Sequence, residues 1–362
     1  MTDPSHFLFE RYREGSHAPW RLRTYYRLRP LLPRSLQLAM RRVYARRQGR
    51  RTFPGWPIED VLVEQQYADL RRRLGDHDRR GVPIVNFWPA GRRFAFVLTH
   101  DVEGPAGVAN IGAVRKVEER HGLVSSWNFC AEQYPIPEGM FSRLRTAGCE
   151  IGLHGIDHNG RLFSSRSAFE ANLPKIHRYL REWDAVGFRA PALHRNPDWM
   201  PELGCEYDSS FPDTDPFEPL PGGCCSIFPF FNGDLVELPV TLAQDHTLFE
   251  ILRHRDIGVW TQKSGWIIRH HGLVNVIVHP DYMLTQERLD LYDELLAFLA
   301  AQDGGWPALP RDVARWWRTR SSLRCERHDD GVRITGPGAE RATVAYAREE
   351  GGRMVFDRAQ PV

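Results

Sequence analysis

The sequence predicts an α/β protein whose strands form a parallel sheet or a (β/α) barrel. From Phe94 onward, short apolar segments of strand length alternate with longer amphipathic segments of helix length. The amphipathic segments are long enough to carry the chain back across a sheet, as parallel strands require. The chain of 362 residues is 42% hydrophobic and 26% charged, a composition that suits a folded core. We therefore expect one large α/β domain with additional segments at both ends.

The expected strands are short, apolar and separated by segments with helical spacing. The strands are residues 94–99, 126–130, 150–153, 185–189, 206–209, 235–240 and 274–278. The helices are residues 108–120, 138–147, 167–183, 256–270, 285–301 and, after Pro310, 311–320. Most strands are thus followed by a helix before the next strand begins, which is typical of a β/α fold.

Residues 1–90 precede this pattern and form a basic, mainly helical N-terminal extension. Its residues 21–51 are rich in arginine, and after Pro33 four apolar residues recur at helical spacing: Leu36, Met40, Val43 and Tyr44. This pattern predicts a short amphipathic basic helix. In the commoner arrangement the apolar stripe packs on the main domain and the arginines face solvent. Alternatively, the helix contacts an anionic surface, either a lipid headgroup layer or a charged glycan.

The C-terminal tail has a different texture from the β/α region. Glycines at 331, 336 and 338 separate two strand-like segments, residues 332–334 and 342–346. We expect a small β appendage over residues 321–362. The chain then divides into the extension at 1–90, the β/α region at 91–320 and this appendage.

Composition excludes several classes of protein. The net charge of +2 does not indicate a nucleic-acid partner. Six cysteines without a CxxC pair predict reduced thiols rather than a disulfide framework or a cysteine-based zinc site. No apolar window approaches the length of a membrane span, and the first residues do not resemble a secretion signal. A cytoplasmic protein is the resulting expectation, with the oligomeric state left open.

Ionisable residues gather where the predicted strands end. Six of them follow four different strands: Asp101 and Glu103, His154 and His158, Arg189, and His279. The carboxyl ends of the strands of a β/α barrel form one mouth, so these residues can converge. His154 and His158 are four apart, and a helical turn after the strand would bring both imidazoles to one side for a divalent ion.

Each of these residues also has a structural interpretation. Two histidines four apart occur by chance on polar helix faces, and a carboxylate at a strand end often caps a helix. Arg189 fits a structural ion pair, and His279 fits a hydrogen-bonded core histidine. The joint occurrence of all six in this order favours a site.

The motifs around these residues resemble those of the polysaccharide deacetylases of the NodB-homology type, carbohydrate esterase family four. The segments LTHDVEG, HGIDH, RAP and HP, which begin at residues 98, 154, 189 and 279, stand where that family has its motifs. The resemblance covers about half of the chain, residues 94–279, and implies a distorted (β/α) barrel. Two positions depart from the family: His100 replaces an aromatic residue, and Glu103 replaces an aspartate. The departure at residue 100 leaves His100 either as a residue that contacts the metal ligands or as an additional ligand.

The resemblance implies a role for each residue. The metal ligands are Glu103, His154 and His158, with Zn²⁺ as the default and Ni²⁺ or Co²⁺ as alternatives. Asp101 is the base, Arg189 holds it, and His279 is the acid. An aspartate should orient that histidine, and the resemblance points to Asp213 or Asp215. If Glu103 does not reach the metal, Asp101 ligates in its place.

The implied reaction is removal of an acetyl or other acyl group from the nitrogen of an amino sugar or glycan. Aromatic residues that could stack on a sugar are Trp127, Tyr134, Phe211, Phe217, Phe230, Phe231 and Tyr282. Gln244, Asp245 and His246 form either a polar rim or, through Asp245, a helix cap. Two other functions stay open: a small-molecule amide or formamide hydrolase, and a noncatalytic glycan- or membrane-surface-binding protein.

Overall fold

The computed structural model describes residues 3–13, 33–75, 81–329 and 331–358. Its centre is a curled sheet in the order β10-β2-β3-β4-β5-β6-β8-β7, with β9 also paired to β2. All pairs in this sheet are parallel except β7 with β8. The α/β class and the distorted barrel expected from the sequence are confirmed.

The strands of this sheet are short apart from β2. They are β2 (Phe94–Val102), β3 (Ser126–Phe129), β4 (Glu150–Leu153), β5 (Gly187–Phe188), β6 (Tyr207–Asp208), β7 (Phe230–Asn232), β8 (Leu235–Glu237), β9 (Leu273–Ile277) and β10 (Gly305–Pro307). Beyond β8, Leu242 donates its backbone N–H to Asn275 of β9 at 3.1 Å, and Asn275 donates to Thr241 Oγ1 at 2.8 Å. These bonds bring the far side of the sheet back to β9 and close the distorted barrel.

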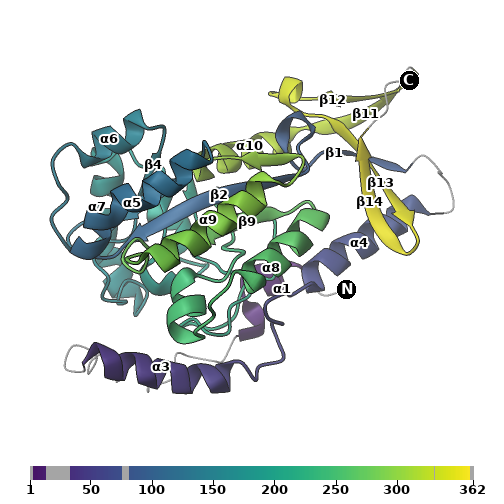
Figure 1. The fold of residues 1–362 in the computed structure, drawn as a ribbon. Helices are drawn as coiled ribbons and strands as arrows, with labels where there is room; N and C mark the ends of the chain where they lie inside the picture. Colours follow the sequence, from purple (N-terminus) through teal and green to yellow (C-terminus); the bar gives the residue numbers. More distant parts are fainter. Residues whose placement is uncertain (1–2, 14–32, 76–80, 330, 359–362) are drawn as a thin grey trace.

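Helices cover the outside of the sheet and lie close to the predicted bounds. They are α5 (Pro105–Arg120), α6 (Met140–Thr146), α7 (Arg166–Glu182), α8 (Gly258–Arg269), α9 (Gln286–Ala300) and α10 (Pro310–Ser322). In Figure 1, α5 and α9 lie side by side across β2. Strand β2 is buried along its whole length, so the residues at its end project from a rigid central element.

The tail forms strands, and part of the N-terminal extension joins them. Strand β1 (Val82–Val85) pairs with β13 (Val344–Glu350), which pairs with β14 (Arg353–Arg358). A separate hairpin joins β11 (Arg324–His328) to β12 (Gly331–Thr335). The division of the chain at residues 90 and 320 stays a prediction.

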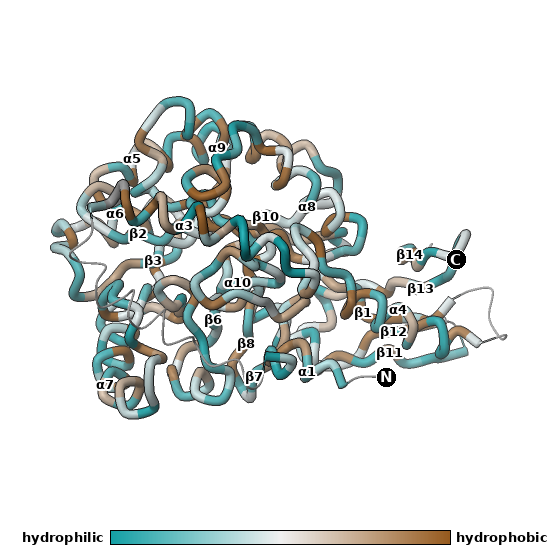
Figure 2. The backbone as a smooth tube through the Cα atoms, turned by 90° about the horizontal axis from the view of Figure 1, so that it is seen from below, coloured by the Kyte–Doolittle hydropathy of each residue, from teal (hydrophilic) through white to brown (hydrophobic). Residues whose placement is uncertain are grey.

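The described part of the extension contains the helices α1 (Ser5–Leu8), α3 (Arg34–Gln48) and α4 (Val61–Leu74), with a short 3-10 turn, η1 (Arg11–Arg13). Helix α3 lies along the bottom of the view in Figure 1, and Figure 2 shows hydrophobic and hydrophilic residues interspersed along it. Its apolar stripe, Leu36, Met40, Val43 and Tyr44, is exposed. The expectation that this stripe packs on the main domain is therefore wrong. None of the described helices is both long and apolar enough to cross a membrane.

Candidate active site

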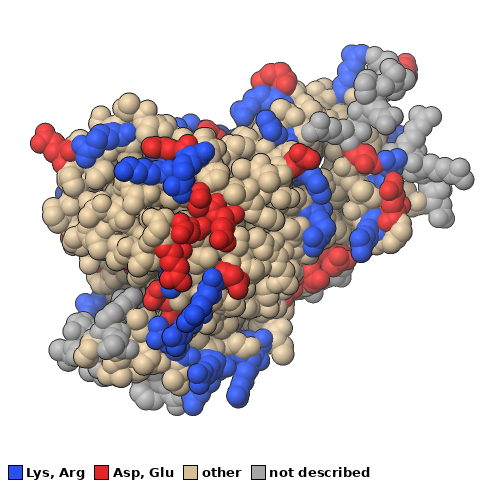
Figure 3. All heavy atoms as spheres, viewed as in Figure 1, with Lys and Arg blue, Asp and Glu red and all other residues tan. Residues whose placement is uncertain are grey.

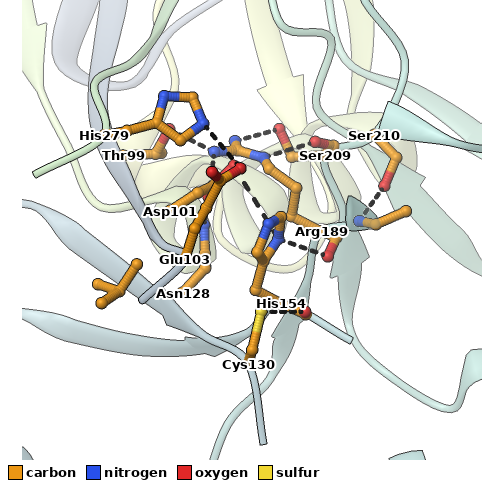
Figure 4. A network of polar contacts seen from close by, with 12 residues as sticks. Thr99, Asp101, Glu103, Asn128, Cys130, His154, Arg189, Ser209, Ser210 and His279 are labelled. Carbon is orange, nitrogen blue, oxygen red and sulfur yellow. Dashed lines mark hydrogen bonds and ion pairs between the residues drawn. The ribbon is translucent and has the colours of Figure 1, made fainter. Parts of the chain in front are cut away.

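The six predicted residues converge at the carboxyl ends of four strands. Asp101 lies at the end of β2 and Glu103 just beyond it, His154 and His158 follow β4, Arg189 follows β5, and His279 follows β9. Figure 4 shows the side chains of Asp101, Glu103, His154, Arg189 and His279 turned toward one another from different strands. The parallel sheet thus brings together residues that lie far apart in the sequence.

Glu103, His154 and His158 form a set that could hold a metal ion. One ligand atom of each residue lies within 4.8 Å of the others, and His158 Nε2 is 2.8 Å from Glu103 Oε1. His154 Nδ1 donates to the carbonyl oxygen of Arg189 at 3.1 Å, which fixes the tautomer. Among the described residues, His154 Nε2 is buried without a hydrogen-bond partner. A buried ring nitrogen with a lone pair directed into this set fits a divalent cation.

The local chain geometry that positions the two histidines differs from the prediction. Residues 154–158 form an irregular loop rather than a helical turn, and helix α7 begins only at Arg166. Gly155 adopts φ +67°, and a Cβ atom there would lie 2.9 Å from Pro191 Cδ. The left-handed turn at Gly155 therefore brings the histidine rings together, with centroids 5.5 Å apart.

Burial and charge hold the site in a state that is ready for a metal. Burial lowers the pKa of His154 to about 4, more than the neighbouring Asp101 raises it, so the imidazole is neutral near pH 7. Burial opposes ionisation of Glu103, but His158, His279 and His154 lower its pKa well below the usual value. A neutral imidazole and an ionised carboxylate are the forms that ligate.

A buried arginine fixes Asp101. Arg189 Nη1 donates to Asp101 Oδ1 at 3.1 Å and to Thr99 Oγ1 at 2.7 Å, while Nε and Nη2 donate to the backbone and side chain of Ser209. Asn128 Nδ2 also donates to Asp101 Oδ1, at 2.8 Å. Burial raises the pKa of Asp101, but Arg189 and the nearby histidines outweigh it and lower the pKa to about 2. Both bonds fall on Oδ1, and Oδ2 lies 4.0 Å from His154 Nδ1.

His279 is held by Asp245. Its Nδ1 donates to Asp245 Oδ1 at 2.6 Å, and its backbone N–H donates to Asp245 Oδ2 at 2.8 Å. Its Nε2 lies 3.8 Å from Glu103 Oε1. Burial lowers the pKa of His279, but Asp245 and the other carboxylates raise it to about 10. The ring is therefore protonated and directs an N–H toward the metal-ligand set.

Three solved structures are similar to this protein over most of their own length. A protein described as a polysaccharide deacetylase from Mycobacterium smegmatis is 20% identical with a TM-score of 0.50, covering 66% of this chain and 94% of that one. A protein from Pseudomonas aeruginosa PAO1 with the same description is 15% identical with a TM-score of 0.52, covering 64% and 93%. The allantoinase Puue is 13% identical with a TM-score of 0.51, covering 67% and 97%. The chain has the polysaccharide deacetylase fold.

The resemblance inferred from the motifs is thereby confirmed at the level of the fold. No protein-family model matches the sequence, and no curated protein is significantly similar to it. The deacetylase fold explains why the residues that follow the four strands meet at one end of the sheet. The roles of the individual residues rest on their geometry.

Within the deacetylase fold, the expected partner of His279 needs correction. The structure does not bring Asp213 or Asp215 to His279. Lys263 Nζ donates to Asp213 Oδ1 at 2.7 Å, and both side chains are buried. Burial raises the pKa of Asp213 to about 7 despite this lysine. Asp245 is instead the aspartate that contacts His279, because its loop lies directly beside the end of β9.

Asp245 also has the structural role expected of a helix cap. Its Oδ1 accepts the backbone N–H of His246 at 2.8 Å, at the start of the short π-helix η6 (His246–Ile251). It is fully buried, so it does not form part of a polar rim. The sequence pointed to the cap, whereas the contact with His279 depends on the position of β9.

His100 lies on the opposite side of β2 from the site. Its Nδ1 donates to the carbonyl oxygen of Val278 at 2.9 Å, and its Nε2 is 2.6 Å from Glu118 Oε1. Successive residues of a strand point to opposite faces, so His100 points away while Thr99 and Asp101 point inward. One ring nitrogen is bonded to the backbone after β9 and the other to Glu118 of α5, so His100 neither ligates a metal in this site nor contacts the ligands.

Three further residues contact the site, and the sequence analysis had named only one of them, Tyr282, as an aromatic residue that could stack on a sugar. Asn128 opposes Asp101 in the parallel register of β2 and β3, and an amide between two aromatic residues of a buried strand was the available signal. Ser209 accepts two hydrogen bonds from Arg189, one at its backbone carbonyl oxygen and one at Oγ. Tyr282 Oη donates to Glu103 Oε2 at 2.9 Å. Five of the aromatic residues expected to stack on a sugar are instead buried: Trp127, Tyr134, Phe211, Phe217 and Phe230.

Proposed function

We propose that this protein is a metal-dependent hydrolase that removes an acetyl or other acyl group from the nitrogen of an amino sugar or glycan. The observation that carries the proposal is the arrangement of an ionised Asp101 and a protonated His279 around one candidate metal-ligand set. Amide hydrolysis needs a group that accepts a proton from the attacking water and a group that protonates the departing amine. Two buried residues with opposite protonation states meet that need.

Glu103, His154 and His158 would hold the divalent ion, with zinc as the first choice for two imidazoles and a carboxylate. An ion held there would acidify the attacking water and polarise the carbonyl oxygen, which compensates for the weakness of a base with a pKa of about 2. Asp101 accepts the proton of that water through Oδ2. Arg189 keeps Asp101 ionised and oriented.

His279 donates a proton from Nε2 to the departing nitrogen. The contact of Nδ1 with Asp245 keeps the ring charged and directs Nε2 toward the carboxylate of Glu103. Tyr282 is half-buried beside this histidine, with ring centroids 5.3 Å apart. It is the aromatic candidate best placed to contact the substrate.

The test combines metal analysis with substrate hydrolysis. Purified wild type should contain one equivalent of a divalent metal and release acetate from N-acetylated sugar oligomers. The double variant His154→Ala/His158→Ala should lose both properties. His328→Ala, which removes an exposed histidine of the β11 hairpin, should keep both. A metal-free wild type that stays inactive with added zinc, nickel or cobalt would exclude the hydrolase and favour a noncatalytic binding protein.

A second candidate, hydrolysis of a small-molecule amide, is supported by the similarity to the allantoinase Puue, whose TM-score of 0.51 equals those of the deacetylases within 0.01. The same ligand set and acid–base pair would serve this reaction. Cyclic amides and formamides assayed beside the sugar oligomers distinguish the two substrates. Ammonia or amine release from small amides without acetate release would favour the second candidate.

A further inference from the structure

Helix α3 is fixed to the body of the protein through one of its faces. Ala45 packs against Phe217 and Ile251 in a small apolar cluster. Two arginines on this side donate to carbonyl oxygens of the body: Arg41 to Phe217 at 2.5 Å and Arg42 to Glu250 at 3.0 Å. The helix is therefore positioned by the main domain and is not a free amphipathic segment.

The opposite face of α3 carries apolar side chains that nothing in the described part of the chain covers. Leu36, Met40, Val43 and Tyr44 are 45%, 44%, 60% and 43% exposed. Their spacing of four, three and one residues puts them on one side of a helix. Among the described residues, they are four of the seven large hydrophobic side chains that are exposed. Such clustering marks an interaction surface, because solvent-exposed apolar residues usually lie singly.

Positive charge lies beside this apolar face, at the C-terminal end of α3. Residues 21–51 contain eleven arginines and no aspartate, glutamate or lysine. Four arginines at and beyond the end of α3 are exposed: Arg46, Arg47, Arg50 and Arg51. Figure 3 shows Lys and Arg gathered over α3 at the bottom of the molecule. An apolar stripe beside a dense group of arginines suits a lipid layer, because the interior of such a layer is apolar and its headgroups can be anionic.

We propose that α3 docks the protein on a membrane surface that carries anionic headgroups. Met40 and Val43 enter the boundary between headgroups and acyl chains, and Arg46 and Arg47 contact the headgroups. A second copy of the chain fits less well, because a two-fold contact through this face would bring the same arginines together. The proposal does not depend on the hydrolytic function.

The body-facing side of α3 contacts a segment that leads to the candidate active site. Arg42 and Ala45 contact η6, the π-helix that begins immediately after Asp245. Asp245 holds His279. Docking through α3 therefore brings the segment that orients the candidate acid close to the membrane surface.

The test is flotation of the full-length protein with phosphatidylcholine vesicles, with and without phosphatidylglycerol. Wild type should float with the anionic vesicles and dissociate from them as salt is raised. Met40→Glu/Val43→Glu should bind at least about tenfold more weakly, since two apolar side chains would lose burial in lipid. Arg46→Gln/Arg47→Gln should weaken binding to anionic vesicles alone. The matched control, Leu284→Glu, replaces an equally exposed apolar residue elsewhere and should bind as wild type does.

Two further measurements accompany the flotation assay. Thermal unfolding tests whether the variants are folded, and light scattering measures the oligomeric state. The α3 variants should unfold like wild type, because the replaced side chains face solvent, and they should keep any activity toward water-soluble substrates. Wild type that does not float with either vesicle would overturn the proposal, as would a Met40→Glu/Val43→Glu variant that binds undiminished. A wild-type dimer that these substitutions dissociate, without vesicle binding, would assign the face to a second copy instead.

Discussion

Replacement of Gly155 by alanine should disturb the candidate metal centre through a steric contact. The new Cβ would lie 2.9 Å from Cδ and 3.0 Å from Cγ of Pro191, and the φ of +67° disfavours any residue with a side chain. Left-handed geometry alone costs about 1 to 2 kcal/mol for alanine. Pro191 must also move, and it follows the segment whose Arg189 carbonyl accepts the hydrogen bond from His154. A shift there tilts the His154 ring.

The matched control is Gly122→Ala. Gly122 has nearly the same φ, +66°, but a Cβ atom there would meet nothing within 4 Å. Both variants should lose stability from the backbone in urea denaturation, by about 1 to 2 kcal/mol. Only Gly155→Ala should bind zinc more weakly, by about tenfold or more, in competition with a chelator. Equal zinc affinity in both variants would refute the argument that Gly155 is required by its contact with Pro191.

Three further predictions concern charge. Asp245→Asn should lower the pKa of His279 from about 10, because the carboxylate that opposes burial is removed; NMR titration of the metal-free protein should find it near or below about 6.5, and an unchanged pKa would contradict the role of Asp245. Arg189→Met should raise the pKa of Asp101 from about 2. Because it leaves a buried carboxylate unpaired, it should also lower the free energy of unfolding in urea by about 3 to 5 kcal/mol. A loss below about 1 kcal/mol would mean that the pair is not buried in solution. Glu150 has a pKa raised by burial to about 7, so the folded state binds a proton that the unfolded state releases from about 4.5 upward. Stability should therefore fall by up to about 3 kcal/mol between these two pKa values and level off above the higher one, and Glu150→Gln should remove this dependence in urea titrations at several pH values.

The barrel and most of the site could be predicted from the sequence. The period of the apolar segments locates β2, β3, β4 and β9 within about one residue at most ends, except that β2 continues to Val102. Strands β5 and β6 have only two residues each, because the curled sheet leaves few regular pairs at those positions. Residues directly after a strand are positioned by that strand, which is why their convergence could be anticipated.

Features that depend on the packing of loops could not be predicted in this way. The aspartate that holds His279 comes from a loop separate in sequence from β9, and spacing alone does not distinguish Asp245 from Asp213. The placement of His158 depends on a left-handed turn at Gly155 rather than on a helix. The orientation of α3 depends on which of its faces packs on the main domain. The face that carries Ala45 and its polar neighbours packs there, and the apolar stripe does not.

Consecutive residues of strand β2 lie in two different environments. Asp101 points to the candidate site, while His100 points to Glu118 in the helix layer. Insertion or deletion of a single residue within β2 would exchange the two faces, sending a carboxylate toward Glu118 and an imidazole toward Arg189. Attempts to re-engineer the protein for other substrates can therefore vary the loops after residue 103, but the length of β2 has to be kept.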